Sequence, residues 1–356
     1  MEHVDIIKKH DYEEISILQN RKAKLFAINV IHDTTRGPAV GGMRFMKYKN
    51  ENDALYDALR LAKSMTYKSA AADLSCGGGK TVIMDIDGMD RKLALKTVAR
   101  FIESLNGRRY GGRDLGVSVE DIDIMRTVTK WVPDESATGV GDLSEATAFG
   151  VYHAMRACLE EVYASDSFCG KKIAVQGVGE VGYWLGKYAV EGGAQVVVAD
   201  VNAKAVEKMI KDFKVVAVSP DKIYGVNCDV FSPCAVGGVM NSTNIAQLQC
   251  KIVAGSANNT LKSEGDGVSL YQKGIIYAPD YIINSGAMIQ WWFRQTTYPV
   301  RDKRDGREVV ANLYNVVKSI LKTSREKKLA PSLVADQYAE SKLKPEKTYA
   351  DMNWGA

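Results

Sequence analysis

Two lysines in the first third of the chain are the first candidates for chemistry. Lys68 and Lys80 are twelve positions apart, and Lys80 directly follows the glycine triplet 77–79. Burial in a dry cleft and a second cation nearby both lower the pKa of a lysine, which can then exchange protons near neutral pH. Asp114, in a glycine-rich segment further along the chain, would orient such a lysine or act as the base. A single lysine is more typical of a solvated surface, and the combination with Asp114 and the glycines favours a site.

The glycine triplet itself needs a physical reason, because consecutive glycines are conformationally costly. Close approach of a ligand to the backbone is one such reason. Gly79-Lys80-Thr81 is also similar to the end of a phosphate-binding P-loop, but Leu74 stands where that motif has a glycine. The motif also requires a helix after its lysine, whereas residues 81–86 are typical of a strand. The sequence therefore argues against a P-loop nucleotide hydrolase.

A second candidate site is a GxGxxG turn between two short apolar runs. Its glycines are Gly177, Gly179 and Gly182, and Asp200 ends the second apolar run eighteen positions after the last of them. In a dinucleotide-binding βαβ unit, the first glycine permits the turn and the second lets the backbone approach the pyrophosphate. The third lets the helix pack on the strand, and the helix N-terminus faces the phosphates. Asp200 would accept hydrogen bonds from the adenine ribose, which favours NAD over its 2′-phosphorylated relative.

The elements that must position these residues follow from the hydrophobic periodicity. In the first third, strands are expected over 14–18, 24–31 and 81–86, and helices over 52–66, 92–105 and 120–132. A linker is expected over 133–142, followed by a helix over 144–164. Apolar runs then recur at 215–218, 229–231, 252–254 and 275–278, and a helix is expected over 308–326. Short strands alternating with helices are typical of a doubly wound parallel sheet.

Composition bounds the class of protein. A chain of 356 residues is long for one domain, and its 46% apolar and 25% charged residues are ordinary for a soluble globular protein. The net charge is +4, and acids interrupt even the tightest basic cluster, 301–307, so no nucleic-acid partner is expected. No run approaches the roughly 18 apolar residues of a membrane span. The first residues lack a signal-peptide core, which predicts a cytoplasmic protein without a membrane partner.

The cysteines and histidines do not form a metal-binding pattern. No CxxC pair occurs, and the few histidines are scattered. We therefore expect no metal site and free thiols in a reducing compartment. The cysteines are Cys76, Cys158, Cys169, Cys228, Cys234 and Cys250, and the histidines are His3, His10, His32 and His153.

Taken together, the motifs resemble the leucine/phenylalanine dehydrogenase branch of the Glu/Leu/Phe/Val amino-acid dehydrogenase superfamily. The similarity extends over residues 28–290 in many separated segments. The segments are 37–42, 65–68, 77–80, Asp114, Thr147, the GxGxxG turn, 231–238, 254–259 and 277–284. The resemblance implies an α/β protein of two domains, an N-terminal mixed α/β substrate domain and a C-terminal Rossmann domain that is doubly wound.

The resemblance also implies roles for particular residues. Lys80 and Asp114 would be catalytic: Lys80 would hydrogen-bond the amine and polarise the attacking water, and Asp114 would exchange protons with Lys80. Lys68 would bind the substrate carboxylate, aided by the backbone of Gly42 and by Asn259. The other substrate-binding residues implied are Val40, Met65, Met288 and Trp291.

The cofactor implied is NAD, held largely by the second domain. Thr147 and Asn259 would lie near the nicotinamide carboxamide. From the residues alone, the pair Asn258-Asn259 would be interpreted as a turn. The full set of cofactor-binding residues implied is Gly177, Gly179, Glu180, Val181, Gly182, Asp200, Val201, Thr147, Cys234, Ala235, Ala257, Asn258, Asn259 and Asn284.

The predicted function is reversible oxidative deamination of an apolar L-amino acid to a 2-oxo acid and ammonia. Phenylalanine or another aromatic substrate is favoured, since Val40 is smaller than the leucine common in relatives with branched substrates. The family usually has Asn-Ala-Gly-Gly where this chain has Asn284-Ser-Gly-Ala287. The following Trp291 and Trp292 could fill or line the substrate pocket, and so narrow it, or lie at a subunit contact, and aromatic pairs at helix starts are more often packing residues. A leucine/valine dehydrogenase is therefore the alternative, and a binding protein without turnover is a further one.

The domain organisation is predicted from the linker and the motifs. Residues 1–135 would form the substrate-binding and oligomerisation domain, with a C-terminal helix over 326–356 packing back on it. Residues 136–325 would form the NAD-binding domain, and the active site would lie in the cleft between the two. The resemblance implies a homo-oligomer, either a dimer or an octamer.

Overall fold

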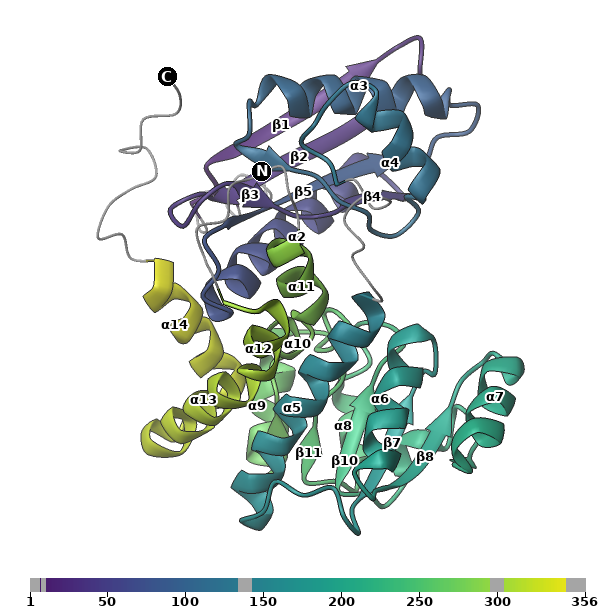
Figure 1. Ribbon diagram of the computed structural model, residues 1–356, viewed down its shortest axis with the longest axis vertical. Coiled ribbons are helices and arrows are strands. Elements are labelled where there is room, and N and C mark those ends of the chain that lie inside the picture. Colours follow the sequence, from purple (N-terminus) through teal and green to yellow (C-terminus); the bar gives the residue numbers. More distant parts are fainter. Residues whose placement is uncertain (1–6, 8–10, 134–142, 295–303, 344–356) are drawn as a thin grey trace. The chain divides into compact units, whose positions relative to one another are not determined.

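The structure is a computed structural model that describes residues 7, 11–133, 143–294 and 304–343 (Figure 1). The chain divides into two compact units. Unit 1 comprises residues 1–140, 292–303 and 340–356, and unit 2 comprises 141–291 and 304–339. The expected linker over 133–142 lies almost wholly outside the described residues, as does the end of the expected C-terminal helix after residue 343. The predicted domain limits of 135/136 and 325/326 stay predictions.

Unit 1 is built on a mixed sheet in the order β1-β2-β5-β3-β6, with β4 also pairing with β5. The pairs β1–β2 and β2–β5 are antiparallel, and β3 and β4 run parallel to β5. The strands are β1 Glu14–Asn20, β2 Leu25–Asp33, β3 Ala39–Val40, β4 Met43–Met46, β5 Gly77–Met84 and β6 Arg109–Tyr110. The helices are α2 Glu51–Ala71, α3 Arg91–Ser104 and α4 Val119–Arg126.

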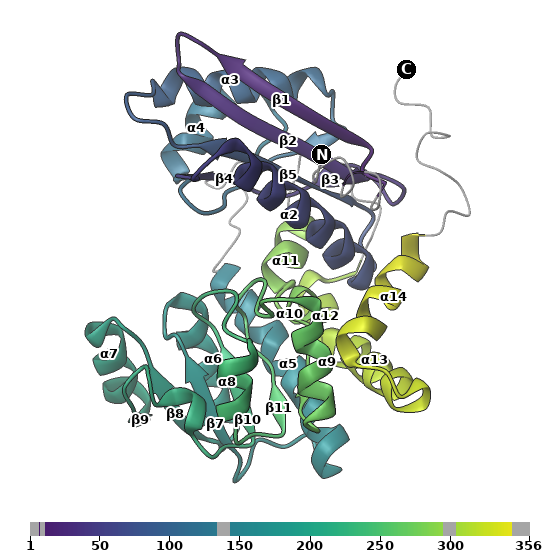
Figure 2. The ribbon, with the colours of Figure 1, turned by 180° about the vertical axis from the view of Figure 1, so that it is seen from behind.

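Alternation along the strands gives this sheet two apolar faces. Val30 and Val82 pack with α2 on one face, while Ala27 and Ile83 pack with α3 and α4 on the other. Figures 1 and 2 show α2 on one side of the sheet and α3 and α4 on the opposite side. The Asn50 side chain caps α2 by accepting a hydrogen bond from the Asp53 backbone at 2.9 Å. The candidate site residues of unit 1 lie on β3, α2 and β5 and in the loops after β3 and β6.

Unit 2 is a six-stranded parallel sheet in the order β12-β11-β10-β7-β8-β9, which confirms the predicted doubly wound fold. The strand order reverses between β7 and β10. The strands are β7 Lys172–Gln176, β8 Gln195–Ala199, β9 Val216–Ala217, β10 Val230–Pro233, β11 Ile252–Val253 and β12 Ile276–Tyr277. The helices are α5 Leu143–Tyr163, α6 Glu180–Glu191, α7 Ala203–Phe213, α8 Ser242–Gln247, α9 Glu264–Gln272, α10 Asp280–Ile283, α12 Gly306–Ala311 and α13 Leu313–Lys327. Two further helices, α11 Gly286–Arg294 and α14 Pro331–Leu343, begin in unit 2, and their last residues, 292–294 and 340–343, belong to unit 1.

Four expected elements differ most from the structure. The helix expected over 52–66 continues to Ala71, so Lys68 lies within it. The strand expected to begin at Thr81 begins at Gly77, so the glycine triplet is part of the strand rather than a turn before it. The helix expected over 120–132 ends at Arg126. The single helix expected over 308–326 is divided at Asn312 into α12 and α13. The boundaries of these elements depend on local packing, which hydrophobic periodicity does not report.

Candidate active site

The glycine triplet allows helix α2 to lie directly against strand β5. A Cβ atom at Gly78 would lie 2.0 Å from the backbone nitrogen of Thr66 in α2. One at Gly41 would lie 1.9 Å from the carbonyl oxygen of Gly79. Only glycine tolerates such approach of one backbone to another. The triplet therefore has a reason within the fold itself, and this reason differs from the expected approach of a ligand.

This close packing gathers the predicted site residues of unit 1. Met65 lies on α2, with its Cγ 3.2 Å from the point that a Cβ at Gly41 would occupy. Lys68 is buried in the last turn of the same helix, about one helical turn from Met65. Val40, on β3, is paired in register with Gly78 of β5. A Cβ at Gly42 would lie 2.8 Å from the Cβ of Asp114, which places this backbone beside the carboxylate.

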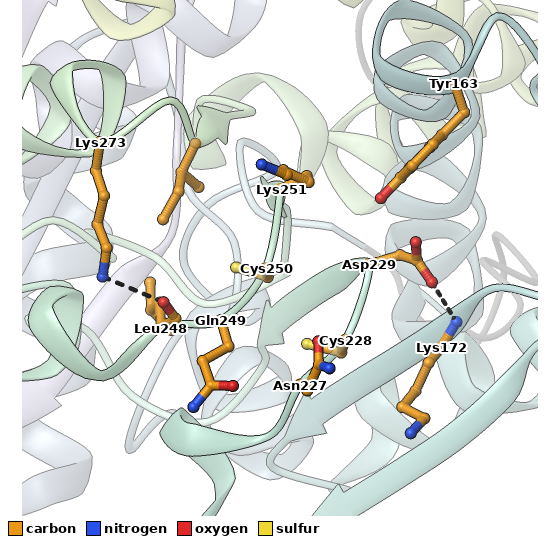
Figure 3. Close-up of a pocket in the computed structure, with 11 residues that line it drawn as sticks. Tyr163, Lys172, Asn227, Cys228, Asp229, Leu248, Gln249, Cys250, Lys251 and Lys273 are labelled. Carbon is orange, nitrogen blue, oxygen red and sulfur yellow. Dashed lines mark hydrogen bonds between the residues drawn. The ribbon is translucent and has the colours of Figure 1, made fainter.

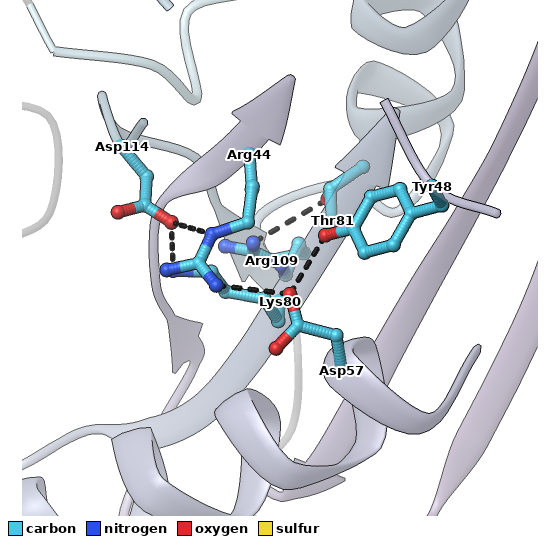
Figure 4. Close-up of polar contacts among 7 residues, drawn as sticks. All are labelled: Arg44, Tyr48, Asp57, Lys80, Thr81, Arg109 and Asp114. Atoms are coloured by element: carbon cyan, nitrogen blue, oxygen red, sulfur yellow. Dashed lines mark hydrogen bonds and ion pairs between the residues drawn. The ribbon is translucent and has the colours of Figure 1, made fainter. Parts of the chain in front are cut away.

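Lys80 and Asp114 form a direct ion pair. The Lys80 Nζ lies 2.8 Å from Asp114 Oδ2, and the lysine side chain is only 6% exposed. The same carboxylate oxygen also accepts a hydrogen bond from Arg44 Nε at 2.9 Å. Figure 4 shows both cations meeting at this one oxygen. Asp114 therefore has two positive partners on one side of its carboxylate.

The protonation states in this cluster differ from those of an ordinary surface ion pair. Burial lowers the pKa of Lys80, and this effect outweighs the opposite influence of Asp114. Burial alone would raise the pKa of Asp114, but Lys80 and Arg44 outweigh it and hold that pKa at about 2. The carboxylate is thus ionised across the physiological range, while the lysine is the group whose proton is held less tightly than usual.

Sequence reasoning missed the residues that surround this pair. Arg44 Nη1 contacts Asp57 Oδ2 at 2.9 Å, and the Tyr48 hydroxyl donates to the same oxygen at 2.7 Å. Arg109 is fully buried on the opposite face of β5, where its Nη2 lies 3.5 Å from Thr81 Oγ1. Burial lowers the pKa of Arg109 to about 9. In the sequence, Arg44 is a charged residue within a short apolar run and Arg109 is one beside a glycine-rich segment. Neither pattern specifies a role for the residue.

The GxGxxG turn of unit 2 uses its glycines in three different ways. Gly177 has φ +95°, which L side chains rarely adopt, and its N–H donates to Ala199 O at 2.8 Å. A Cβ at Gly182 would lie 2.0 Å from the carbonyl oxygen of Gly177, so this glycine lets α6 pack on the turn. Gly179 precedes α6, and a Cβ there would meet no described atom within 4 Å. The space beside Gly179, at the N-terminus of α6, is open.

Asp200 follows β8, as predicted, and it also stabilises the glycine turn. Its Oδ2 accepts a hydrogen bond from the Val178 backbone at 2.7 Å, and its Oδ1 accepts one from Asn202 N at 2.8 Å. Each carboxylate oxygen can accept more than one hydrogen bond, so these contacts leave capacity for a ligand hydroxyl. The neighbouring Val201 is 92% exposed. Glu180, in the first turn of α6, accepts a hydrogen bond from Ser144 Oγ at 2.7 Å, and Val181 follows it.

Cys234 and Ala235 follow the carboxyl end of β10, and Asn284 follows helix α10. Ala235, after Cys234, approaches the turn: its backbone nitrogen lies 2.7 Å from the point that a Cβ at Gly177 would occupy. Asn284 Nδ2 donates to Asn258 Oδ1 at 2.9 Å, while Asn284 Oδ1 is buried without a hydrogen-bond partner among the described residues.

Other predicted residues of unit 2 adjoin the carboxyl end of β10 or lie on nearby helices. The Ala257 backbone N–H donates to Pro233 O at 3.0 Å, and Asn259 has φ +51°. Thr147 lies on α5, with its Cα 3.0 Å from the point that a Cβ at Gly286 would occupy. Met288 and Trp291 lie on α11, where Met288 is buried and Trp291 is half-buried.

A pocket of about 580 Å³ lies elsewhere in unit 2, at the amino ends of β7, β10 and β11 (Figure 3). Its lining includes Lys172, Cys228, Asp229 and Cys250 and none of the predicted site residues. Within the described part of the chain, no three His, Cys, Asp or Glu side chains gather closely enough to hold a metal ion. No helix among those same residues is both long and apolar enough to cross a membrane.

Comparison with known proteins identifies the family of the chain. Residues 14–138 match the family described as Glu/Leu/Phe/Val dehydrogenase, dimerisation domain, and residues 139–339 match Glutamate/Leucine/Phenylalanine/Valine dehydrogenase. Leucine dehydrogenase from Thermoactinomyces intermedius is 42% identical over 346 residues, which cover 96% of this chain and 94% of the relative. Phenylalanine dehydrogenase from Lysinibacillus sphaericus is 42% identical over 295 residues, covering 80% of this chain and 77% of the relative.

The solved structure of L-tryptophan dehydrogenase from Nostoc punctiforme is also similar, with a TM-score of 0.83 and 34% sequence identity. The similarity covers 96% of this chain and 98% of the other. The fold and the matches over nearly the whole length define an amino-acid dehydrogenase. The chain belongs to the Glu/Leu/Phe/Val dehydrogenase family, and within it to the type that includes the leucine, phenylalanine and tryptophan enzymes.

Proposed function

We propose that this chain is an NAD-dependent dehydrogenase that converts an apolar L-amino acid reversibly into a 2-oxo acid and ammonia. The observation that carries the proposal is the buried Lys80–Asp114 pair, with its 2.8 Å contact and a lysine whose pKa is lowered. A base of this kind is what the reaction requires, because the ammonium of the substrate must lose a proton before Cα can lose a hydride.

In the proposed reaction, Lys68 and the Gly42 backbone bind the substrate carboxylate and fix the orientation of Cα. Neutral Lys80 accepts a proton from the substrate ammonium, while ionised Asp114 orients the lysine. Bound NAD supplies the hydride acceptor. Lys80 passes this proton to solvent and, oriented by Asp114, takes another from water as the water oxygen bonds to the iminium carbon. Lys80 then returns that proton to the nitrogen, and the C–N bond breaks as the new hydroxyl loses its proton to solvent, which leaves the 2-oxo acid and ammonia. Since the base must be neutral, deamination should accelerate as the pH rises through the pKa of Lys80, which is lowered by burial.

The cofactor assignment rests on unit 2. The open space beside Gly179 at the N-terminus of α6 suits a pyrophosphate, and the carboxylate of Asp200 suits ribose hydroxyls. The buried, unpartnered Asn284 Oδ1 is an acceptor of the kind that a carboxamide NH₂ would satisfy. Together with the remaining cofactor residues named above, these groups would hold NAD, and Asp200 would disfavour a 2′-phosphate by charge.

For the substrate we propose phenylalanine or another aromatic amino acid, and leucine or valine as the second candidate. Val40 is small, and it lies with Met65 in the part of unit 1 that holds Lys80. The leucine alternative is favoured by a relative named leucine dehydrogenase at 42% identity over 96% of this chain. We also propose a homo-oligomer, supported by the match of residues 14–138 to a family described as a dimerisation domain.

The test is formation of NADH, measured by absorbance with NAD and each of the twenty L-amino acids, and repeated with NADP. We expect turnover with apolar substrates and a preference for NAD. Absence of signal with every amino acid would overturn the enzymatic proposal. The ranking of phenylalanine, tryptophan, leucine and valine in the same panel decides between the two substrate candidates, and light scattering of the same sample tests the oligomer.

A further inference from the structure

Arg44 is a second cation in the catalytic cluster, and the reaction proposed above gives it no role. It lies on β4, and its side chain is only 11% exposed. Its guanidinium joins two carboxylates, through Nε to Asp114 Oδ2 at 2.9 Å and through Nη1 to Asp57 Oδ2 at 2.9 Å (Figure 4). Asp57 is in turn held by the Tyr48 hydroxyl at 2.7 Å. Arg44 is therefore fixed from two sides.

The charges show what such an arrangement does to the base. An isolated lysine–aspartate pair holds the lysine in its charged form, because deprotonation would leave the aspartate without a positive partner. Here Asp114 Oδ2 keeps a cation at 2.9 Å even when Lys80 is neutral. Arg44 itself stays charged, since Asp114 and Asp57 outweigh its burial and raise its pKa. The carboxylate consequently has a permanent partner, and the lysine is free to gain and lose a proton.

We propose that Arg44 is a positioning residue that keeps Asp114 ionised and oriented, so that Lys80 can cycle between its neutral and charged forms. The inference rests on the proposed function and adds a residue to it. Asp57 and Tyr48 act through Arg44, by fixing the plane of the guanidinium. Both cations use Oδ2 of Asp114, and a hydrogen bond from the Leu115 backbone holds the carboxylate further.

The groups that act on Lys80 come from several elements, and the test must separate them. Asp114 raises the pKa of Lys80, whereas burial, Arg44 and Arg109 lower it. Arg109 lies on β6, on the other face of β5, where its Nη2 is 3.5 Å from Thr81 Oγ1 (Figure 4). Removing Arg44 alone therefore changes both partners of the pair at once: Asp114 loses a cation, and Lys80 loses a repelling charge.

The experiment compares Arg44→Met, which removes the charge, with Arg44→Lys, which keeps the charge and loses the two-sided geometry. Protein labelled with [ε-¹³C]lysine reports the protonation of Lys80, whose signal is the one missing from Lys80→Ala. We expect the titration midpoint of Lys80 to move to higher pH in Arg44→Met and to stay near the wild-type value in Arg44→Lys. At pH 8, kcat/KM for deamination should fall about tenfold or more in Arg44→Met and recover at higher pH, because one nearby charge shifts a pKa by about a unit or more.

A matched control is Arg91→Met, which removes another arginine–aspartate pair of unit 1, with Arg91 Nη2 at 2.5 Å from Asp121 Oδ2. This variant should lose stability without moving the Lys80 titration or the pH profile. An unchanged Lys80 midpoint in Arg44→Met, together with a lower melting temperature, would show that Arg44 is a structural ion pair only. If Arg44→Met does not fold, Arg44→Gln and Arg44→Lys provide the same contrast between lost and retained charge.

The experiment distinguishes a wrong role for Arg44 from a wrong proposed function. If the wild-type protein turns over no amino acid, the proposed function fails, yet the titration of Lys80 still reports whether Arg44 controls its proton. If the wild type is active, Lys80→Ala is inactive and Arg44→Met has the wild-type pH profile, then the proposed function stands and the role given to Arg44 is wrong.

Discussion

The two units of this protein each contain a glycine-rich segment, and the segments serve different ends. In unit 1, the triplet before Lys80 is filled by the protein's own chain: a Cβ at Gly77 would lie 1.9 Å from Asp33 O, and one at Gly78 2.0 Å from Thr66 N. In unit 2, the GxGxxG turn leaves the position of Gly179 open, with no described atom within 4 Å of a Cβ. The first segment packs a helix on a strand, and the second leaves room for a ligand.

The difference matters for how each unit obtains its function. Close packing in unit 1 brings α2, β5 and the loop after β6 together, so Lys80 and Asp114 meet at 2.8 Å. Unit 2 instead presents the N-terminus of α6 and the carboxyl ends of its strands. In unit 1 the glycines act on chemistry indirectly, through packing, whereas Gly179 would act directly on a bound group. The same residue type therefore has two physical meanings in one chain.

The largest expected effect is that of Gly78→Ala on folding. The added methyl group would meet the backbone of α2 at Thr66, which cannot move aside as a flexible side chain could. We expect the free energy of unfolding to fall by at least about 3 kcal/mol, or the protein to be recovered only as aggregate. Urea unfolding measures this, with Gly112→Ala as the control because no atom lies within 4 Å of a Cβ there. If Gly78→Ala is as stable as the wild type, the glycine triplet of unit 1 is not required for packing α2 on β5.

Next in size is the effect of Gly179→Ala on cofactor binding. The methyl group would occupy open space beside the N-terminus of α6, so the fold should tolerate it, at a cost of about 1 kcal/mol or less. NAD affinity should fall about tenfold, because the backbone could no longer approach the pyrophosphate closely. Calorimetric titration with NAD checks this. Unchanged affinity in a folded variant would mean that the open position is not where the dinucleotide binds.

A smaller effect is expected for Asp200→Ser on cofactor choice. In the wild type, the Val178 N–H donates a hydrogen bond to Asp200 Oδ2 at 2.7 Å. Serine removes the negative charge and still provides an oxygen that can accept this hydrogen bond. The preference for NAD over NADP should therefore decrease about tenfold, since a 2′-phosphate would no longer meet a carboxylate. The ratio of kcat/KM for the two cofactors measures it, with the melting temperature as a check on the turn. If the ratio of kcat/KM for NAD and NADP equals that of the wild type, Asp200 stabilises the glycine turn and does not select the cofactor.

The fold of unit 2 was predictable because its signals are local. Strand, glycine turn, helix and acidic residue follow one another within a single βαβ segment, from Lys172 to Asp200. The pair Lys80–Asp114 could be proposed from residue types and from resemblance. Its environment could not, because Arg44, Asp57 and Asp114 come from β4, α2 and a distant loop. No spacing rule connects such residues, and only the folded sheet brings them together.

Element boundaries were the other part that the sequence did not reveal. Because glycine is typical of turns, the sequence favours a strand that begins at Thr81. In the structure β5 begins at Gly77, since the glycines let its backbone pack closely against α2. The expected helix 308–326 is interrupted at Asn312, although no glycine or proline lies there to predict the interruption. These are tertiary effects, and a pattern read along one chain does not contain them.

We propose that unit 1 determines the chemistry while unit 2 determines the cofactor, and Lys80→Ala tests this proposal most directly. NADH formation and NAD affinity are measured on the same folded variant, beside the wild type. We predict that turnover falls at least about 10³-fold, because the base is lost, while the dissociation constant for NAD is unchanged. Loss of NAD affinity together with turnover would contradict the claim and would assign Lys80 to the cofactor site instead.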